Sequence, residues 1–393
     1  MDSRPLPRAQ SLTAAPRFDP VSDVTTPEAT VDPFAADTPP ELNEVRAGED
    51  LDWARIEAYL RAELPDDLDI DGDFTVLQFP NGAANLTYMI RFGTTELVLR
   101  RPPHGTLAPG AHDMRREHKV LSVLWQVFDK APRAYVFCDD HEIAGADFFV
   151  MERCRGEVIR GVIPRSMRDQ PDVGRRAGFA LVDAIAEFHL LDPYEVGLGD
   201  LGRPDGFVAR QVSGWKKRWG LVADARYDEA MSSIHARLEH SMPTPQRVSF
   251  VHNDLKLDNC MFAPGQPDEL ISFFDWDMTT IGDPLIDIGT LLNYWPEADD
   301  APDSPRLSHD GMQRMGLPSR ADIAERYGEQ SGLDVSFTPW YDAFAQWKTA
   351  TVIQQLHHRW LVGASTDPRM EFVAARLPHL VEGATVLLDD LEA

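Results

Sequence analysis

The sequence has few cysteines, few basic residues and no long apolar run, and each shortage excludes a class of protein. Cys138, Cys154 and Cys260 are too few and too scattered for a disulfide framework or a zinc site. No stretch reaches the roughly 18 apolar residues that a membrane span needs, and the first residues lack the apolar core of a signal peptide. We therefore expect a soluble, cytoplasmic protein with reduced thiols and no membrane partner.

Basic residues are outnumbered by acidic ones. The chain has 38 Lys and Arg against 64 Asp and Glu, a formal net charge of −26. Such a chain repels phosphate backbones, so nucleic-acid binding is not expected as its main role, although a local basic pocket is compatible with this balance. Apolar residues make up 43 % of the 393 residues, enough for a substantial core. At roughly 150 residues per domain, the length predicts two or three folding units.

The first 50 residues are rich in proline and lack apolar periodicity. Residues 1–50 hold eight of the 30 prolines and ten acidic residues. This segment cannot bury enough apolar surface to offset its ordering entropy, so we expect a disordered tail or one draped over the folded body. Asp52 then precedes an apolar repeat at helical spacing that begins at Trp53, which predicts a capped first helix.

Two patterns follow along the chain. Over 51–154, short β-rich runs predict strands, and a helical period predicts one further helix; the strands cover 74–79, 85–92, 96–100, 134–140 and 148–153, and the helix covers 112–128. Over 155–393 the pattern is mostly helical; helices are predicted at 173–191, 207–222, 283–295 and 339–361, with short strands around loops at 249–277. We predict an α+β protein with a small β-rich N-terminal lobe and a larger helical C-terminal lobe.

The most distinctive motif is VHNDLKLDN (251–259). It places His252, Asp254 and Asn259 in the spacing His-x-Asp-x-x-x-x-Asn, for which residue frequencies give about 0.02 chance occurrences in this chain. A hairpin with a tight turn is predicted directly after the motif, and it would bring Asp275 back beside Asn259. The alternative is a structural turn with a side-chain cap and a buried histidine.

These residue types suit phosphoryl transfer. Its transition state spreads negative charge over oxygens, so positioning and cations do most of the work. Asp254 is the candidate base that accepts the proton of the attacking hydroxyl, and Lys256 could neutralise the moving phosphoryl group. Asn259 and Asp275 could hold Mg²⁺ against the ATP phosphates without excess negative charge.

HNDLKLDN followed by FDWD resembles the aminoglycoside phosphotransferase-like family, small-molecule kinases with a protein-kinase-like fold. The resemblance covers roughly residues 70–300. It implies a two-lobed protein-kinase-like fold with ATP in the cleft between the lobes. Asp283 is then expected to cap the next helix and brace the catalytic loop, whereas Asp287 and His189 are expected to be structural.

The same resemblance assigns nucleotide-binding roles in the N-terminal lobe. Arg100 stands where such kinases carry a phosphate-gripping lysine on the third strand, and Glu117 is the expected partner that orients it. The alternative for this couple is a surface ion pair. Further candidates are Gly82, Ala83, Ala84 and Asn85 in a loop over the phosphates, and Met151, Glu152 and Cys154 where the lobes join and adenine should lie. The latter three are equally compatible with plain core packing.

The acceptor is expected to be a small molecule. Only residues 276–282 separate Asp275 from Asp283, too few for the activation loop of a protein kinase. Acidic walls could receive a cationic aminoglycoside. Alternatively, LRRPP, AHDMRREHKVL and RQVSGW are similar to segments of the family branch associated with acyl-CoA dehydrogenases, which implies hydroxyacyl-CoA phosphorylation and is preferred here. A nucleotide-binding pseudokinase without turnover is a third possibility, and the oligomeric state is open.

One basic cluster stands out in this acidic chain. Four cations lie within nine residues of ARQVSGWKKRW (209–219): Arg210, Lys216, Lys217 and Arg218. Trp215 and Trp219 are one helical turn apart and are predicted to bury one face of a helix, which would direct the cations elsewhere. The cluster is either a solvated helix face or a docking site for the phosphates of a CoA tail.

Overall fold

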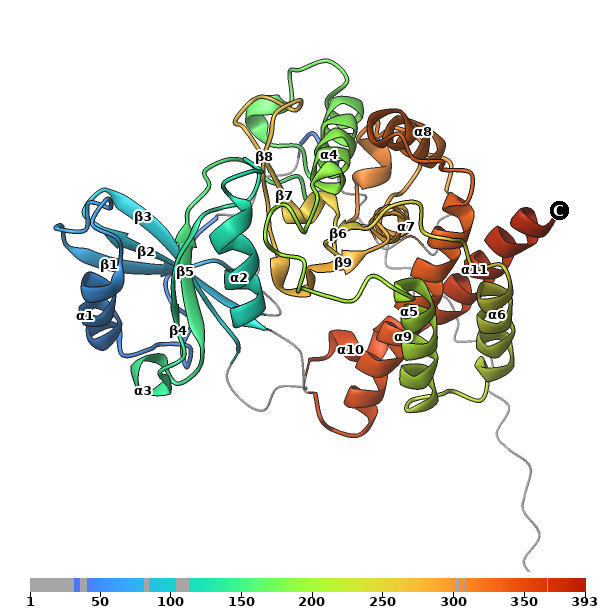
Figure 1. The fold of residues 1–393 in the computed structure, drawn as a ribbon, viewed down its shortest axis with the longest axis horizontal. Helices are drawn as coiled ribbons and strands as arrows, with labels where there is room; N and C mark the ends of the chain where they lie inside the picture. The colour runs from blue at the N-terminus through green and yellow to red at the C-terminus, as the bar shows by residue number, and fades with distance from the viewer. Residues whose placement is uncertain are drawn as a thin grey trace, which may run out of the picture.

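The computed structural model describes residues 32–35, 41–80, 85–103, 113–300, 304, 306, 308–365 and 367–393. A β-rich lobe stands beside a larger helical lobe (Figure 1). The small lobe contains α1 (Trp53–Glu63), β1 (Phe74–Gln78), β2 (Leu86–Phe92), β3 (Thr95–Arg101), α2 (Met114–Leu124), β4 (Ala134–Cys138), α3 (His141–Ala144) and β5 (Phe148–Glu152).

The small lobe is an antiparallel sheet with one helix against each face. Its strand order is β1-β2-β3-β5-β4. Because successive side chains of a strand point to opposite faces, β3 divides its residues between two cores: Leu97 and Leu99 pack with Ile56 of α1, whereas Val98 packs with Leu121 of α2. Arg100 follows the parity of Val98, so the register of β3 directs its side chain towards α2.

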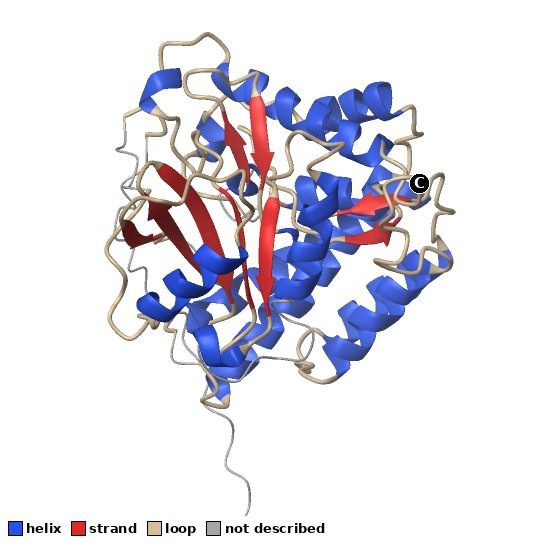
Figure 2. Cartoon of the chain, turned by 60° about the vertical axis from the view of Figure 1, so that its left-hand side comes forward, coloured by secondary structure: helices blue, strands red, loops and turns tan. Residues whose placement is uncertain are grey.

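The large lobe is helical around two short strand pairs (Figure 2). Its helices are α4 (Val173–Leu190), α5 (Phe207–Gly220), α6 (Asp228–His240), α7 (Leu285–Asn293), α8 (Arg320–Ser331), α9 (Thr338–Leu361), α10 (Arg369–Phe372) and α11 (Leu377–Glu392). Its strands are β6 (Ser249–Val251), β7 (Cys260–Phe262), β8 (Leu270–Phe273) and β9 (Thr280–Gly282). β6 pairs with β9 and β7 with β8, both antiparallel. No described helix is long and apolar enough to cross a bilayer.

A close backbone approach joins the lobes after β5. Glu157 and Phe262 exchange two backbone hydrogen bonds of 2.8 Å. Any side chain at Gly156 would collide with this pairing, because a Cβ there would lie 2.4 Å from the carbonyl oxygen of Phe262. The linker is therefore fixed directly against the strand that follows the catalytic motif.

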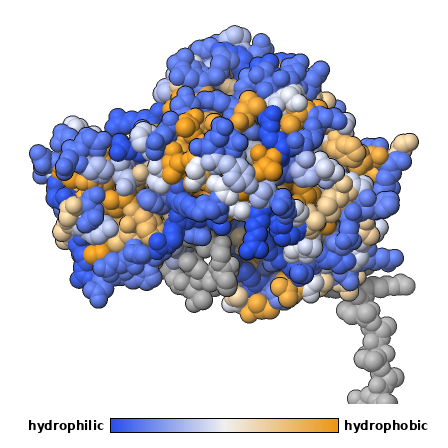
Figure 3. Space-filling model, viewed as in Figure 1, coloured by the Kyte–Doolittle hydropathy of each residue, from blue (hydrophilic) through white to orange (hydrophobic). Residues whose placement is uncertain are grey.

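The structure confirms the predicted α+β class, the five strands of the small lobe and the hairpin after the motif. Residues 41–50, part of the predicted tail, lie along the small sheet: Asn43 pairs with Gln78 of β1, and the Tyr88 hydroxyl donates to the Glu49 carbonyl. The domain boundaries at residues 50 and 154 stay a prediction. The face seen in Figure 3 is largely hydrophilic, with apolar residues in small groups.

Candidate active site

The catalytic loop begins where β6 ends. The backbone N–H groups of His252 and Asn253 donate to the two carboxylate oxygens of Asp287, at 2.6 and 2.7 Å. Asn253 has a φ of 71°, a left-handed conformation that costs free energy in a residue with a side chain. Its side-chain amide donates to the carbonyl of Met278 at 2.9 Å, which ties the loop to the segment after Asp275. The loop is thus held in a conformation that it would not adopt alone.

Asp254 lies at the centre of the loop. Lys256 Nζ is 2.8 and 2.9 Å from its two carboxylate oxygens, and Asn259 Nδ2 donates to its Oδ2 at 2.7 Å and to its carbonyl at 2.8 Å. Burial favours a neutral Lys256 amine, but the Asp254 carboxylate outweighs this effect and raises the pKa of Lys256 to about 12. Lys256 is therefore a fixed positive charge beside the candidate base.

The β7–β8 hairpin brings Asp275 to this loop. Cys260 is opposite Phe273 in its register, and the Phe274 N–H donates to the Asn259 carbonyl at 2.8 Å. Asp275 has a φ of 60°, again left-handed. The predicted juxtaposition of Asp275 and Asn259 is confirmed, because the hairpin turns as the sequence indicated.

Arg100 connects the small lobe to Asp275. Its guanidinium is 2.7 Å from Glu117 Oε1 and 2.7 Å from Asp275 Oδ1. The Arg100 and Glu117 side chains are 6 % and 0 % exposed, so the alternative of a surface ion pair does not hold. Burial alone would raise the pKa of Asp275, but Arg100 holds that pKa below its usual range. The Asp275 carboxylate therefore stays ionised.

The residue that braces the loop is Asp287, not Asp283. Besides the two loop amides, Asp287 lies 3.1 Å from His189 Nε2, and His189 Nδ1 lies 2.8 Å from the Tyr327 hydroxyl. Asp283 accepts hydrogen bonds from the Leu285 N–H and the Tyr341 hydroxyl. Its carboxylate therefore accepts a hydrogen bond from the first N–H of α7, whose N-cap position is Pro284. The bracing role expected of Asp283 belongs to Asp287, one turn later. His189 is fully buried in this network.

The remaining nucleotide-side candidates differ in placement. Gly82, Ala83 and Ala84 lie outside the described residues, and Asn85 is buried just before β2. Met151 is buried in the core beside α2. The Glu152 carboxylate accepts a hydrogen bond from the Arg133 N–H at 3.2 Å. Burial raises the pKa of the half-buried Cys154 thiol. An adenine-binding role for Met151, Glu152 and Cys154 stays a prediction.

The four cations of the predicted basic cluster do not converge. Arg210 donates to the backbone carbonyls of Asp205 and Arg203. Lys216 Nζ is 3.2 Å from His235 Nδ1 on α6. Lys217 is exposed. The Arg218 guanidinium instead lies over the buried Trp215 ring, 4.3 Å from its centroid. The two tryptophans are buried as predicted.

Two residues near the catalytic loop were not singled out from the sequence. The first is Tyr294, which directly follows α7. Its ring centroid lies 4.8 Å from Lys256 Nζ. Lys348 of α9 lies within electrostatic range of Asp254 and Lys256. A signal for Lys348 was present in the sequence, since it is the single Lys or Arg between Arg326 and Arg359, within a helix that is otherwise rich in apolar residues.

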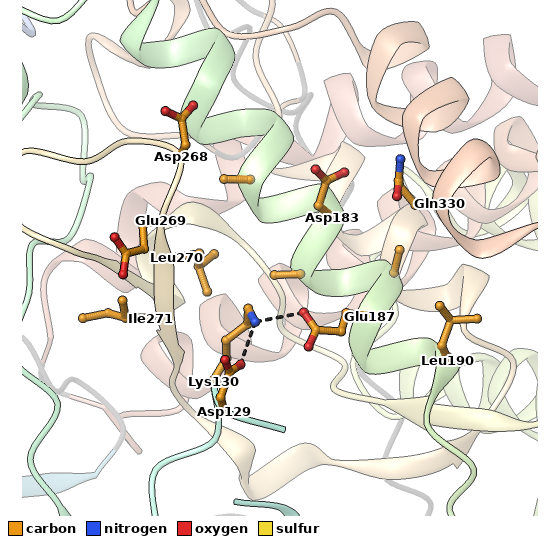
Figure 4. A pocket seen from close by; sticks show the side chains of 13 residues that line it. Asp129, Lys130, Asp183, Glu187, Leu190, Asp268, Glu269, Leu270, Ile271 and Gln330 are labelled. Carbon is orange, nitrogen blue, oxygen red and sulfur yellow. Dashed lines mark hydrogen bonds and ion pairs between the residues drawn. The ribbon is translucent and has the colours of Figure 1, made fainter. Parts of the chain in front are cut away.

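A groove of about 560 Å³ lies elsewhere, between α4 and β8 (Figure 4). None of the candidate site residues is among those that line it. Its lysine is already neutralised, because Lys130 Nζ lies 2.7 Å from Asp129 and 2.8 Å from Glu187. Asp183 at its edge is paired with Arg326. The catalytic geometry is therefore not associated with this groove.

Comparison with protein families decides the assignment. The model of the phosphotransferase enzyme family matches residues 75–322, which include both strand pairs, the catalytic loop and Arg100. The chain belongs to this family. It is therefore a phosphotransferase, as the motif and the kinase-like resemblance predicted.

Similar sequences occur within longer proteins. The rat protein named acyl-CoA dehydrogenase family member 11 is 31 % identical over 339 residues, covering 84 % of this chain and 42 % of the relative. Mouse family member 10 is 29 % identical over 303 residues, covering 75 % of this chain and 27 % of the relative. The chain thus spans less than half the length of these relatives.

Solved structures show the same fold. A putative aminoglycoside phosphotransferase from Ralstonia eutropha has a TM-score of 0.71 at 25 % identity, covering 87 % of this chain and 99 % of that one. Choline kinase from Cryptosporidium parvum has a TM-score of 0.57 at 11 % identity, covering 86 % and 97 %. A thermostable aminoglycoside phosphotransferase mutant, in ternary complex with AMP-PNP and hygromycin B, has a TM-score of 0.52 at 14 % identity, covering 84 % and 98 %. The predicted protein-kinase-like fold is confirmed.

Proposed function

We propose that this phosphotransferase transfers the γ-phosphoryl group of ATP to a hydroxyl group of a small molecule. The observation that carries the proposal is the convergence of Asp254, Asn259 and Asp275 through the catalytic loop and the β7–β8 hairpin. The acceptor oxygen bonds to the γ-phosphorus, the bond from that phosphorus to the β–γ bridging oxygen breaks, and ADP leaves. The hydroxyl proton passes to the Asp254 carboxylate.

Fixed cations support the charge balance of this transfer. Lys256 lies against both oxygens of Asp254 and keeps its charge because its pKa is raised. Its ammonium group is placed to stabilise negative charge on the transferred group. Arg100, oriented by Glu117, supplies a second permanent charge from the small lobe to the nucleotide phosphates.

Asn259 and Asp275 fit a magnesium ion by the chemistry of their donors. Both hydrogen bonds of the Asn259 side chain are donated by Nδ2 to Asp254, which leaves its Oδ1 available as a ligand. Asp275 offers an ionised carboxylate whose second oxygen does not contact Arg100. One carboxylate and one amide suit Mg²⁺ that is also held by phosphates and water. The bound ion would neutralise phosphate charge.

A hydroxyacyl-CoA is the preferred acceptor. The similarity to acyl-CoA dehydrogenase family members 10 and 11 supports this acceptor class. An aminoglycoside-type acceptor is the alternative, supported by the fold of the structural neighbours. A pseudokinase without turnover is less well supported, because Asp254, Lys256 and Asn259 are present and hydrogen-bonded together.

An ATP-consumption screen tests the proposal. Purified protein is given MgATP with a panel of hydroxyacyl-CoAs and a panel of aminoglycosides, and Asp254→Asn serves as the inactive control. We expect ADP formation that depends on a hydroxyacyl-CoA. Turnover of an aminoglycoside but of no CoA ester would overturn the preferred acceptor. Binding of ATP without turnover of either panel would favour the pseudokinase.

A further inference from the structure

Two cations from two different helices lie against the indole ring of Trp215. The Arg218 guanidinium of α5 lies 4.3 Å from the ring centroid, and Lys348 Nζ of α9 lies 5.7 Å from the same centroid. Trp215 itself is only 7 % exposed, so the ring is fixed by the packing of α5 against α9. Both positive charges therefore lie against the same fixed ring.

Neither cation has an acidic partner within the described part of the chain. Both cations contact the Trp215 ring, and no carboxylate of the described residues lies within ion-pair distance of Lys348 Nζ or of the Arg218 guanidinium. By contrast, Asp342 near the start of the same helix α9 is paired with Arg306. An anion brought by a ligand would offset the mutual repulsion of these two charges.

The pair is connected to the catalytic loop by a short series of contacts. Lys256 beside Asp254 lies over the ring of Tyr294. Asn293, the residue before Tyr294, donates from its side-chain amide to Thr349 Oγ1 at 3.1 Å. Thr349 directly follows Lys348 in the sequence. Burial lowers the pKa of Lys348; Asp254 and Asp287 oppose this effect, while Arg218 and Lys256 add to it. The charges of the candidate base and of Arg218 therefore both act on Lys348.

We infer that Lys348 and Arg218, over Trp215, form a subsite that binds an anionic group of the acceptor while the hydroxyl faces Asp254. The inference rests on the proposed function and narrows its substrate class to acceptors with a phosphate or carboxylate group. It replaces the four-residue basic cluster with a pair: Arg210 and Lys216 are engaged elsewhere. The pair would repel a polycationic acceptor, so it favours an acyl-CoA over an aminoglycoside.

The test compares single-charge variants on acceptors that differ in their anionic groups. Lys348→Gln and Arg218→Gln each remove one charge of the pair, and Arg226→Gln removes one charge from an exposed ion pair with Asp224. The acceptors are hydroxybutyryl-CoA, hydroxybutyryl-pantetheine, which lacks the phosphates, and free hydroxybutyrate. A phosphate-binding subsite predicts a KM for the CoA ester that rises on the order of tenfold in both pair variants, with kcat nearly unchanged.

The acceptor panel separates the two sources of negative charge. Loss of affinity for the CoA ester but not the pantetheine ester identifies a phosphate, whereas loss confined to free hydroxybutyrate identifies a carboxylate. KM values that match those of Arg226→Gln on every anionic acceptor would overturn the subsite. So would an equal rise in KM caused by Lys216→Gln and Lys217→Gln together, because the anion would then bind on the outer face of α5.

Calorimetry tests anion binding at the subsite independently of the proposed phosphoryl transfer. If the wild-type protein phosphorylates none of these acceptors, the acceptor class of the proposed function is wrong. Titration of CoA and inorganic pyrophosphate into the ADP-bound protein then decides the subsite alone. Binding that weakens about tenfold in Lys348→Gln and Arg218→Gln, but not in Arg226→Gln, supports the subsite. Absence of anion binding to the wild-type protein overturns it.

Discussion

The proposed donor and acceptor sides of the site differ in whether their cations are paired with carboxylates. On the donor side, Arg100 lies between Glu117 and Asp275, 2.7 Å from each. On the acceptor side, Lys348 and Arg218 contact an indole and no acid of the described chain. The paired Arg100 is held in one orientation and is expected to contact the phosphates of any nucleoside triphosphate. The unpaired Lys348 and Arg218 are expected to bind only acceptors that carry a negative charge. Selectivity is therefore expected to come from the large lobe.

Asp254→Asn should give the largest effect, because it removes the base but keeps the shape of the side chain. We expect kcat to fall by about 10²–10⁴, with nucleotide affinity nearly unchanged, since Arg100 and Glu117 are untouched. Steady-state kinetics and binding of a fluorescent ATP analogue measure the two quantities. Wild-type turnover in this variant would remove Asp254 from the mechanism.

Breaking the donor-side pair should affect both nucleotide binding and stability. Arg100→Met leaves the buried Glu117 without its partner, whereas Glu117→Gln replaces the carboxylate that orients Arg100 by a neutral amide. Breaking a buried charged pair typically costs about 3–5 kcal/mol. Both variants should raise the KM for ATP, and the double variant should cost less than the sum, because the two side chains share one function. Chemical denaturation and ATP kinetics on the four proteins complete the cycle. Strict additivity would show that the pair does not act as a unit.

Asp287→Asn, in the first turn of α7, and Asp283→Asn, just before this helix, form a matched pair. Asp287 now accepts hydrogen bonds from two loop N–H groups, one on each carboxylate oxygen. Asp287→Asn leaves a single side-chain oxygen to accept both, so kcat should fall on the order of tenfold. Asp283→Asn weakens the hydrogen bonds from the first N–H of α7 and from Tyr341, so it should mainly lower the free energy of unfolding by about 1 kcal/mol. Equal losses of kcat in both variants would contradict the assignment of the bracing role to Asp287.

The smallest effect is expected at the edge of the catalytic loop, where His309 Nε2 lies 2.7 Å from Asp258 Oδ2. This hydrogen bond raises the pKa of His309 above 6.5, against burial and the charges of Arg160 and Lys256. A raised histidine pKa stabilises the fold below the unfolded-state pKa and loses that contribution as pH rises through the folded-state value. Because the side chain is half exposed, the contribution should stay below about 1 kcal/mol.

Urea denaturation at about pH 6 and pH 8 measures the contribution of His309 to the free energy of unfolding, with His309→Gln as the comparison. The wild-type protein should lose more stability than the variant as the pH rises. An identical pH dependence in both proteins would show that the ion pair contributes nothing to stability.

Much of this site was predictable because its geometry is local in sequence. The spacing of Asp254 and Asn259 and one tight hairpin suffice to bring Asp275 beside them. Strand parity also makes Arg100 face α2, where Glu117 lies. These relations depend only on the period of a strand and on the turn of one hairpin.

The parts that sequence reasoning missed depend on packing between distant helices. Asp283 and Asp287 are both plausible loop braces from spacing, and only the placement of α7 against β6 decides between them. Lys348 lies on α9, and nothing in its local pattern indicates that it meets Trp215 of α5. Tertiary contacts of this kind have no short-range signature.

The hydrogen bonds from Tyr327 through His189 and Asp287 to the loop also bear on how the protein folds. They join α8, α4, α7 and the residues after β6, which lie between 34 and 138 positions apart in the sequence. Contacts over such separations form late, because the loop-closure entropy must be overcome first. During refolding, helical circular dichroism should therefore return before enzymatic turnover. An enzyme that regained both signals at one rate would have its catalytic loop ordered from the start.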